Sequence, residues 1–588
     1  MKTISTLLIC IALLLASCNE KRPDLSCETF AELPDPTDDI LSDWTGIASG
    51  MHASFVSIDT RYPKSVAPQI APRSKTELVA WRGERVSAQL LLWSADSISQ
   101  VECEFSDFKS PTSTMPSSVA EARFVRYVMT DIFAEGCGHR KPEDFPASLS
   151  ADMLDNLACM NIDPKTVRPV WISVDVPASA AEGTYNAELK VYAKNNEVQK
   201  FDIQIEVQAP LLPEASQWNY HLDLWQHPSA VARVGNLKPW SDEHYDAMKP
   251  IMSMLAQAGQ KVITCNLNKD PWNGQCYDMY EDMIMWNKNA DNTWTYDYSI
   301  FDKWVQFMMD LGVTKQINCY SMVPWNNELH YKDAATDKMI TVKADPGTKI
   351  FEDMWTPFLK DFVSHLRQKG WLEITCIAMD ERSPADMKAT LGLAQEVAPE
   401  LGISLADNHK SYKQYPYIKD MCVSLEAPVE AEILASRKAK GLTTTYYVCC
   451  SHEFPNVFTF SEPAEAAYSA WYTSAAGLDG YLRWAYNSWT ENPLLDSRFR
   501  TWPAGDTYIV YPDARSSIRF ERMREGIQDA EKIAILRKQF ENSTKEEDKA
   551  KLNALNACME AFKSHEKPSE ACHDVLNAGK KVINELSR

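Results

Sequence analysis

Two adjacent carboxylates, Asp380 and Glu381, stand directly after the apolar run of residues 372–379. The dipeptide Asp-Glu occurs at one other place, Asp242-Glu243, where acidic residues suit the start of a predicted helix. No such reason holds at Asp380-Glu381, because ending a buried strand on two charges stabilises nothing. Two like charges at a semi-buried position raise the pKa of one carboxyl group, as a general acid working near neutral pH requires.

The spacing of this pair favours a particular chemistry. Most glycosidases use two carboxylates from different strands, about 5 Å or 6.5–9.5 Å apart. Neighbouring residues of one strand point apart and do not easily flank one anomeric carbon. They fit substrate-assisted cleavage, in which Glu381 protonates the glycosidic oxygen while Asp380 orients a 2-acetamido group whose oxygen closes to an oxazoline. The structural alternative is a salt bridge to Arg382 or a cap for a helix from Ala385 onward.

The elements that must position the pair form a repeating pattern from residue 218 onward. Short apolar strands alternate with amphipathic stretches of helical length, as in a (β/α)8 barrel, whose chemistry lies at the carboxyl ends of its strands. Eight strands are predicted: Tyr220–Trp225, Val262–Leu267, Gln316–Met322, Glu373–Met379, Gly402–Ala406, Met421–Leu425, Thr443–Val448 and Tyr481–Tyr486. Helical patterns between them include 242–258, 300–311, 351–369 and 385–397.

The rest of the chain divides around this barrel. Residues 1–17 resemble a signal peptide, and Leu15-Ala16-Ser17-Cys18 resembles a bacterial lipobox, so cleavage before Cys18 and lipidation of its thiol are expected. We further expect a polar leader over 18–40, a β-sandwich over 41–210, the barrel over 214–500, and a helical tail over 501–588 that packs against the barrel. The protein is therefore expected in a bacterial cell envelope, periplasmic or surface-exposed, and attached to the membrane only through its lipid.

Composition and motifs exclude several classes of function. The 588 residues include 60 basic and 81 acidic side chains, and the net charge of −21 argues against a nucleic-acid binder. No phosphate-binding loop, dinucleotide fingerprint or serine elbow is present, so no cofactor is expected. The 15 cysteines lack Cys-x-x-Cys spacing, and several lie in apolar runs, which predicts few or no disulfides. No close spacing of ligands predicts a metal site.

With the carboxylate pair in view, the chain resembles glycoside hydrolase family 123 over about residues 60–540. The specific parts are Met379-Asp380-Glu381 and a block running from Gly477 to Asp529. The block is shared with a broad group of uncharacterised bacterial barrel proteins and implies a fold, whereas the pair narrows the activity. The resemblance implies a retaining, exo-acting β-N-acetylgalactosaminidase that removes terminal β-linked GalNAc from glycans, including those of glycosphingolipids. The resemblance also implies that Asp380 polarises the acetamido N–H and that Glu381 acts first as the general acid and then as the general base.

Other strand ends supply candidate sugar-binding residues. Trp484 and Tyr486 lie two apart, hence on one strand face, where they would stack on the sugar. His409, with Asn408 beside it, follows the fifth strand and is placed to bind a hydroxyl or the acetamide. Four further candidates stand at similar positions, namely Tyr447, Tyr320, Asn266 and Trp225.

Two other functions remain open at this point. The chain would be a surface glycan-binding lipoprotein without catalysis if the sandwich and the aromatic residues only held sugar. It would be a conventional retaining glycosidase if a second carboxylate, such as Glu426 after the sixth strand, were the nucleophile. Galacto or gluco specificity and the oligomeric state also stay open.

Overall fold

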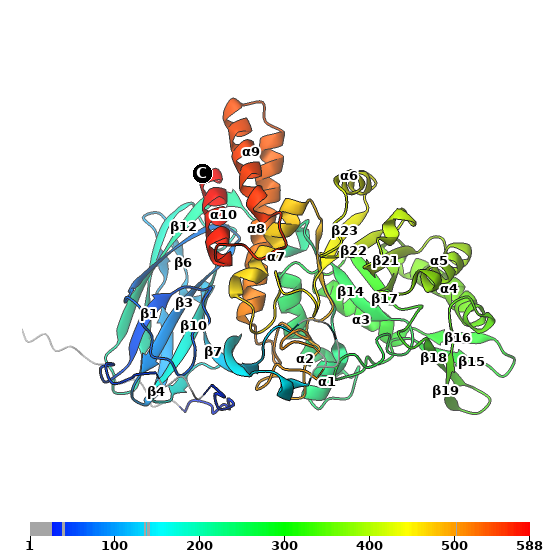
Figure 1. The fold of residues 1–588 in the computed structure, drawn as a ribbon, viewed down its shortest axis with the longest axis horizontal. Coiled ribbons are helices and arrows are strands. Elements are labelled where there is room, and N and C mark those ends of the chain that lie inside the picture. Colours follow the sequence, from blue (N-terminus) through cyan, green and yellow to red (C-terminus); the bar gives the residue numbers. More distant parts are fainter. Residues whose placement is uncertain (1–25, 38–41, 135–136, 138–140, 501) are drawn as a thin grey trace, which may run out of the picture.

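The computed structural model describes the whole chain except residues 1–25, 38–41, 135–136, 138–140 and 501. A mostly β region lies at one end, a barrel lies at the other, and long helices stand between them (Figure 1). The predicted signal peptide and Cys18 lie outside the described residues. In the described part, no helix is both long enough and apolar enough to cross a membrane.

The region predicted as a β-sandwich is mostly β and contains two sheets. One has the order β1 (His52–Val56), β3 (Arg85–Ser94), β10 (Thr166–Asp175), β7 (Ala120–Thr130), β8 (Ser148–Leu154). The other has the order β2 (Lys75–Arg82), β12 (Gln199–Leu211), β11 (Gly183–Tyr192), β4 (Ile98–Phe105), β9 (Met160–Ile162), with β5 (Phe108–Lys109) and β6 (Thr114–Met115) attached. Every second side chain of β11 from Tyr185 to Val191 is buried, in one core with Leu90 and Ile172 of the first sheet. The period-two pattern thus gives β11 one buried face, whereas β10 in the first sheet is buried on both faces.

Part of the predicted leader is held against this region. Cys27 forms a disulfide with Cys159. The Glu32 carboxylate lies 2.6 Å from the Arg168 guanidinium and 2.6 Å from the Lys64 ammonium group. Burial raises the pKa of Glu32, but these two cations outweigh burial and bring the pKa to about 2. This stretch therefore belongs to the folded region and is not a free leader.

The disulfides agree with the prediction of few or none. The described residues contain two, Cys27–Cys159 and Cys137–Cys450, which join residues 132 and 313 positions apart. Cysteines this distant give no spacing signal, which is why the sequence did not indicate them. The other described cysteines are free, and most of them are buried as small apolar side chains.

All eight predicted barrel strands are present and parallel to their neighbours. They are β13 (His221–Leu224), β14 (Val262–Asn266), β17 (Gln316–Tyr320), β20 (Thr375–Met379), β21 (Gly402–Asp407), β22 (Asp420–Ser424), β23 (Thr443–Tyr447) and β24 (Gly480–Arg483). Their order around the barrel is their order in the chain. Between β13 and β14 the barrel is nearly closed, because the Lys261 N–H donates to the Leu222 carbonyl at 3.0 Å.

Helices cover the outside of the barrel, with one gap. They are α1 (Pro228–Val234), α2 (Asp242–Gln257), α3 (Ser299–Asp310), α4 (Lys349–Lys369), α5 (Pro384–Val397), α6 (Ala431–Ala439), α7 (Pro463–Ala476) and α8 (Ile518–Glu541). Between β21 and β22 the chain makes only a 3-10 turn, Ser411–Lys413, so the expected strand-then-helix unit is incomplete there. The loops after β14 and β17 are long and form a small extra sheet from β15 (Met285–Lys288), β16 (Trp294–Asp297), β18 (Glu328–Asp333) and β19 (Lys338–Lys343).

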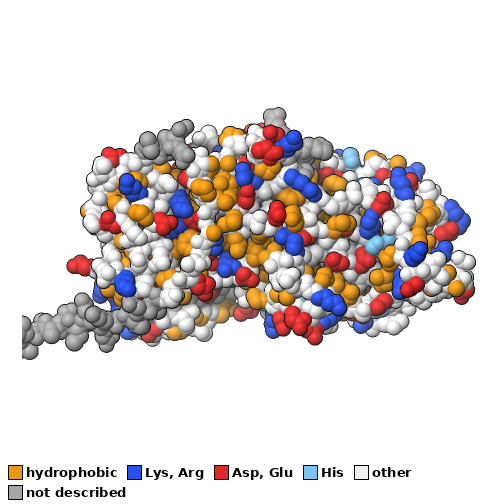
Figure 2. Space-filling view, turned by 90° about the horizontal axis from the view of Figure 1, so that it is seen from below, with side chains coloured by type: hydrophobic (Ala, Val, Ile, Leu, Met, Phe, Trp, Pro, Cys, Tyr) orange, Lys and Arg blue, Asp and Glu red, His pale blue; other side chains and the backbone are white. Residues whose placement is uncertain are grey.

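The helical tail begins with α8, which also serves the barrel. A β-carbon at Gly526 would lie 2.5 Å from the Ala467 carbonyl oxygen, so glycine lets α8 approach α7 closely. Another face of α8 contacts the N-terminal β region through an ion pair, in which Lys532 Nζ lies 2.7 Å from Glu84 Oε1. The chain ends with α9 (Glu546–Met559) and α10 (Cys572–Leu586) beside α8 (Figure 1). Basic and acidic side chains are interspersed over the face of the molecule seen in Figure 2.

Candidate active site

A pocket opens at the carboxyl ends of the barrel strands. Its position is where barrel enzymes carry their chemistry. It is lined by Cys137, Trp225, Gln275, Trp325, Asp380, Glu381, Ala406, Tyr447, Cys449, Cys450, Leu482, Trp484, Trp502 and Asp506. The pocket therefore contains both carboxylates of the predicted pair and three of the predicted binding residues, Trp225, Tyr447 and Trp484.

Asp380 follows the last residue of β20 and is buried, with 7% of its surface exposed. Its Oδ2 accepts two hydrogen bonds, from the indole N–H of Trp272 at 3.0 Å and from that of Trp325 at 2.9 Å. Burial raises the pKa of Asp380 to about 6, against the lowering effect of the two indoles, and the charge of Glu381 adds to the rise. The raised pKa expected for one member of the pair thus falls on Asp380, and burial is its main cause.

The two tryptophans come from matching tripeptides, Pro271-Trp272-Asn273 and Pro324-Trp325-Asn326. The tripeptides lie side by side, because the Trp325 N–H donates to the Pro271 carbonyl at 2.9 Å and Asn326 donates to the Asn273 side chain at 3.0 Å. Neither tryptophan was among the binding residues predicted from the sequence. The repeated Pro-Trp-Asn, placed after the second and third strands, is the signal that would have found them.

Glu381 is exposed at the mouth of the pocket, and its Oε1 accepts a hydrogen bond from the Tyr447 hydroxyl. Burial, and next the charge of Glu381, raise the pKa of Tyr447, so this hydroxyl stays protonated and donates. In the part of the chain that the structure describes, the pair neither forms a salt bridge to Arg382 nor caps the following helix. Arg382 donates to Asn327 at 3.1 Å instead of to either carboxylate, and the cap of α5 is Ser383, which accepts from the Asp386 N–H at 3.1 Å.

Aromatic side chains form the walls. Trp225 stacks on Trp272, with ring centres 4.7 Å apart, and Tyr320 packs behind both. Trp484 meets Trp502 edge to face at 5.7 Å. Sugar rings stack on such surfaces while their hydroxyls bind polar groups at the edges. Tyr320 thus supports the pocket from behind, since it is buried and does not line it.

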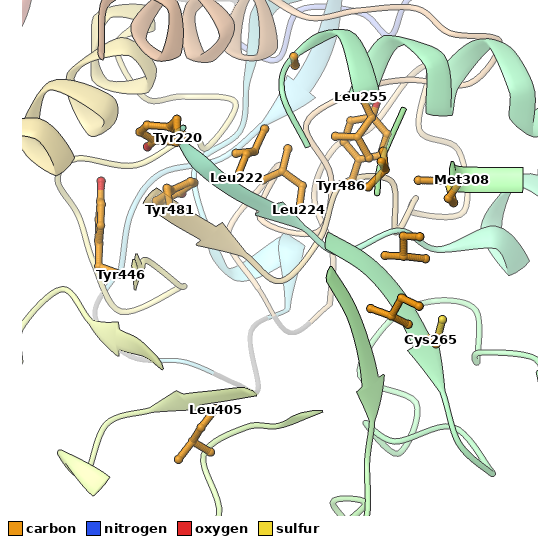
Figure 3. Close-up of a cluster of buried hydrophobic side chains, with 14 of the residues drawn as sticks. Tyr220, Leu222, Leu224, Leu255, Cys265, Met308, Leu405, Tyr446, Tyr481 and Tyr486 are labelled. Atoms are coloured by element: carbon orange, nitrogen blue, oxygen red, sulfur yellow. The ribbon is translucent and has the colours of Figure 1, made fainter. Parts of the chain in front are cut away.

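Tyr486 is a wrong prediction. It is completely buried, and its hydroxyl donates to the Ile251 carbonyl at 2.9 Å. Figure 3 shows it beside Leu255 in the apolar core outside the barrel. The strand β24 ends at Arg483, so the alternation that would have placed Tyr486 on the face of Trp484 no longer applies.

The remaining candidates lie outside the pocket lining. Asn266 is buried, and its amide donates to the carbonyls of Asn268 and Glu281, both at 3.0 Å, which fixes the loop after β14. His409 and Asn408 follow β21 in a turn held by Asp407, and neither lines the pocket. Glu426, the alternative nucleophile, is exposed and also absent from the lining.

The disulfide Cys137–Cys450 forms part of the pocket wall and joins the β region to the loop after β23. The sulfur of Cys449 lies within 4.8 Å of both disulfide sulfurs. These three sulfurs are the one group of possible metal ligands that comes together in the described residues, and the disulfide occupies two of them.

Removing this disulfide is expected to weaken both stability and substrate binding. In the Cys137→Ser, Cys450→Ser variant we expect a loss of about 2–5 kcal/mol in unfolding free energy, because the bond closes a long loop. A higher KM should accompany it, since the bond lines the pocket. Denaturant unfolding and steady-state kinetics check this. The matched variant Cys27→Ser, Cys159→Ser should lose stability with KM unchanged, and equal KM effects of the two variants would contradict the pocket role.

The pH dependence of activity follows from Asp380. If its carboxylate must be ionised, kcat/KM falls as pH drops through about 6, because the carboxylate takes up a proton there. Trp325→Phe removes a hydrogen bond that lowers this pKa, so the acidic limb should move to higher pH. Profiles between about pH 4 and 8 test this. Trp294→Phe, in the small extra sheet, is the control, and an unmoved limb in Trp325→Phe would refute the assignment.

A parallel barrel with a carboxylate pair in an aromatic pocket at its carboxyl edge is the arrangement of a glycoside hydrolase. The comparisons agree. The sequence profile described as glycoside hydrolase 123, catalytic domain, matches residues 225–536, and the glycoside hydrolase 123 N-terminal domain matches residues 55–193. The chain belongs to glycoside hydrolase family 123, and the matched catalytic range extends into α8.

A solved relative covers nearly the whole molecule. A family 123 glycoside hydrolase from Clostridium perfringens, described in the context of glycolipid glycan hydrolysis, is 27% identical. It matches with a TM-score of 0.81 over 91% of this chain and 98% of its own. A family 5 xyloglucanase from Bacteroides ovatus is 11% identical over 77% of this chain and 98% of its own, but its TM-score of 0.27 supports no argument. Among curated proteins, no match to the sequence is found.

Proposed function

We propose that this glycoside hydrolase is a retaining exo-β-N-acetylgalactosaminidase that works by substrate-assisted catalysis. One observation carries the proposal: the two indole N–H groups occupy Oδ2 of Asp380 and fix the carboxylate. The other oxygen, Oδ1, is then the acceptor for an acetamide N–H of the substrate. A carboxylate held in this way orients a substrate group and is not free to attack the anomeric carbon.

The reaction has two steps. The acetamide oxygen attacks C1, Asp380 accepts the hydrogen bond of the acetamide N–H, and Glu381 gives its proton to the departing glycosidic oxygen. Water then attacks C1 of the oxazoline, Glu381 takes its proton, and the acetamide is restored with the β configuration retained. Tyr447 donates to Glu381 from the neighbouring wall and holds it in position.

The glycan of a glycolipid is the substrate class that we propose. The relative from Clostridium perfringens is described for hydrolysis of such glycans. In this chain, the pocket is open at its mouth, where Glu381 is exposed, so a large aglycone can extend into solvent while one terminal sugar fills the pocket.

A panel of nitrophenyl β-glycosides with and without the 2-acetamido group tests the function. Release of nitrophenol from the GalNAc glycoside, with none from the galactoside, is the expected result, and a thiazoline analogue should inhibit. Binding of glycans with no release of sugar would favour the non-catalytic lipoprotein. Trapping of a covalent glycosyl-enzyme on Glu426 would favour a conventional nucleophile.

We also propose that Cys18 is lipidated and holds the enzyme in the bacterial envelope. The two disulfides support a location outside the reducing cytoplasm. Metabolic labelling with a fatty-acid probe should mark the full chain and lose the label in Cys18→Ala. Equal labelling of the two would refute the anchor.

A further inference from the structure

A third carboxylate lines the pocket and has no part in the proposed mechanism. Asp506 lies in the long segment between β24 and α8, and its side chain is completely buried in the pocket wall. Asp380 and Glu381 are the other carboxylates of the lining. Asp506 therefore needs an explanation of its own.

A buried arginine fixes this carboxylate. Arg483, the last residue of β24, donates from Nη2 to Oδ1 of Asp506 at 2.8 Å and to its backbone carbonyl at 3.2 Å. From Nη1 it donates to Asn456 at 2.9 Å, and Asn456 in turn donates to the His452 carbonyl at 2.7 Å. The guanidinium thus holds the Asp506 carboxylate in a fixed orientation.

The barrel order places Asp506 across the pocket from the reacting centre. Counted around the barrel, β24 lies four strands from β20, which is the opposite side of an eight-stranded ring. Asp380 and Glu381 stand at β20 and take the C1 and C2 substituents of the sugar. A hexose ring that spans the pocket then points its C3, C4 and C6 hydroxyls toward β24 and Asp506.

The position of Cys449 indicates that Asp506 and Glu381 border the same cavity. Burial raises the pKa of the Cys449 thiol, and the charges of Asp506 and Glu381 both raise it further. Cys449 also lines the pocket. Asp506 and Glu381 therefore face one cavity, within electrostatic reach of one thiol.

We propose that Asp506 binds the hydroxyls on the far side of the 2-acetamido sugar and determines which epimer the enzyme accepts. The inference rests on the proposed function. A fixed carboxylate accepts short, strong hydrogen bonds from hydroxyls, and a site built this way strongly rejects a sugar that lacks the hydroxyl or carries it in the other orientation.

The test compares hydroxyl-deleted substrates. We measure kcat/KM of wild type and Asp506→Asn on nitrophenyl β-GalNAc, its 3-, 4- and 6-deoxy analogues, and the gluco epimer. Wild type should lose about 10–100-fold on at least one deoxy analogue, whereas Asp506→Asn should lose about as much on the parent sugar and little more on that analogue. Equal losses of the variant on every substrate would overturn the inference.

A matched control separates binding from folding. Asp152→Asn also breaks a buried pair, with Arg519 at 2.9 Å, but away from the pocket lining, so it should cost stability without changing the preference among deoxy sugars. If Asp506→Asn does not fold, Asp506→Glu keeps the charge beside Arg483 and moves it by one methylene. An unchanged deoxy preference in that variant would also overturn the inference.

The outcomes distinguish this inference from the proposed function. Wild type that cleaves no 2-acetamido glycoside refutes the function, whatever Asp506 does. Wild type that cleaves it with the same deoxy preference as folded Asp506→Asn refutes the inference alone. Azide rescue of Asp506→Ala, together with a glycosyl ester trapped on Asp506 of the wild-type enzyme, would show that Asp506 is a nucleophile and would overturn both.

Discussion

Asp380→Asn is expected to lower kcat/KM for a 2-acetamido glycoside by about 10²–10³-fold, the usual cost of losing one preorganised electrostatic contact. The carboxylate balances the positive charge that develops on the oxazolinium ion, and the neutral amide of Asn does not. The amide oxygen can still accept from Trp272 and Trp325, so the pocket should keep its shape. Steady-state kinetics on the GalNAc glycoside give the measurement.

The same variant is expected to be more stable than wild type at neutral pH. The pKa of Asp380 is raised from 3.8 to about 6 in the folded protein, so ionisation above that range opposes folding. The penalty grows as pH rises from about 4 to 6 and amounts to about 3 kcal/mol when complete. Asn does not ionise, and the stability gap between variant and wild type should therefore widen with pH and level off above 6.

Asp242→Asn is the matched control, because it changes the other Asp-Glu pair, on an exposed helix start paired with Lys303. It should leave activity unchanged. Full hydrolysis by Asp380→Asn would refute the substrate-assisted mechanism. If the difference in unfolding free energy between Asp380→Asn and wild type did not change with pH, the ionised Asp380 carboxylate would not destabilise the fold as predicted.

The strands and the carboxylate pair were predictable because both are local. An apolar run of about five residues that ends in charges is visible along the chain, and the pair lies at the end of β20 as a barrel requires. The end of β24 is less visible. Apolar residues continue past Arg483 into a loop. Tyr486 was therefore predicted to lie on a strand face, although it belongs to the core.

The partners of the pair come from far along the chain. Trp272 is 108 residues from Asp380, and Trp325 is 55 residues away, on loops whose course depends on the small extra sheet. The disulfide in the pocket wall joins residues 313 apart. Contacts of this kind depend on packing of the whole fold, which local periodicity does not encode. Asp506 was missed for the same reason, since its place opposite β20 follows only from the closed order of the strands.

Glu381→Gln is expected to lower turnover of a substrate with a poor leaving group by about 10²–10⁴-fold, because it removes the proton that the glycosidic oxygen needs. A dinitrophenyl glycoside leaves with little acid help, so its first step should be affected much less. Gln keeps the size of the side chain and can still accept from Tyr447, so KM should change little. The measurement is kcat across a series of leaving groups.

Rescue by azide distinguishes the acetamide mechanism from one in which Glu426 is the nucleophile. In Glu381→Ala, azide should restore turnover by attacking C1 of the oxazoline, since azide needs no general base, and the product should be the β-glycosyl azide. Glu426→Gln is the matched control, because Glu426 is an exposed carboxylate that does not line the pocket, and it should keep full activity. If Glu426→Ala were the inactive variant and azide gave the α product, a carboxylate nucleophile would replace the acetamide. The acetamide mechanism predicts the β azide from Glu381→Ala, a strongly impaired Asp380→Asn, and cleavage that requires the 2-acetamido group of the substrate.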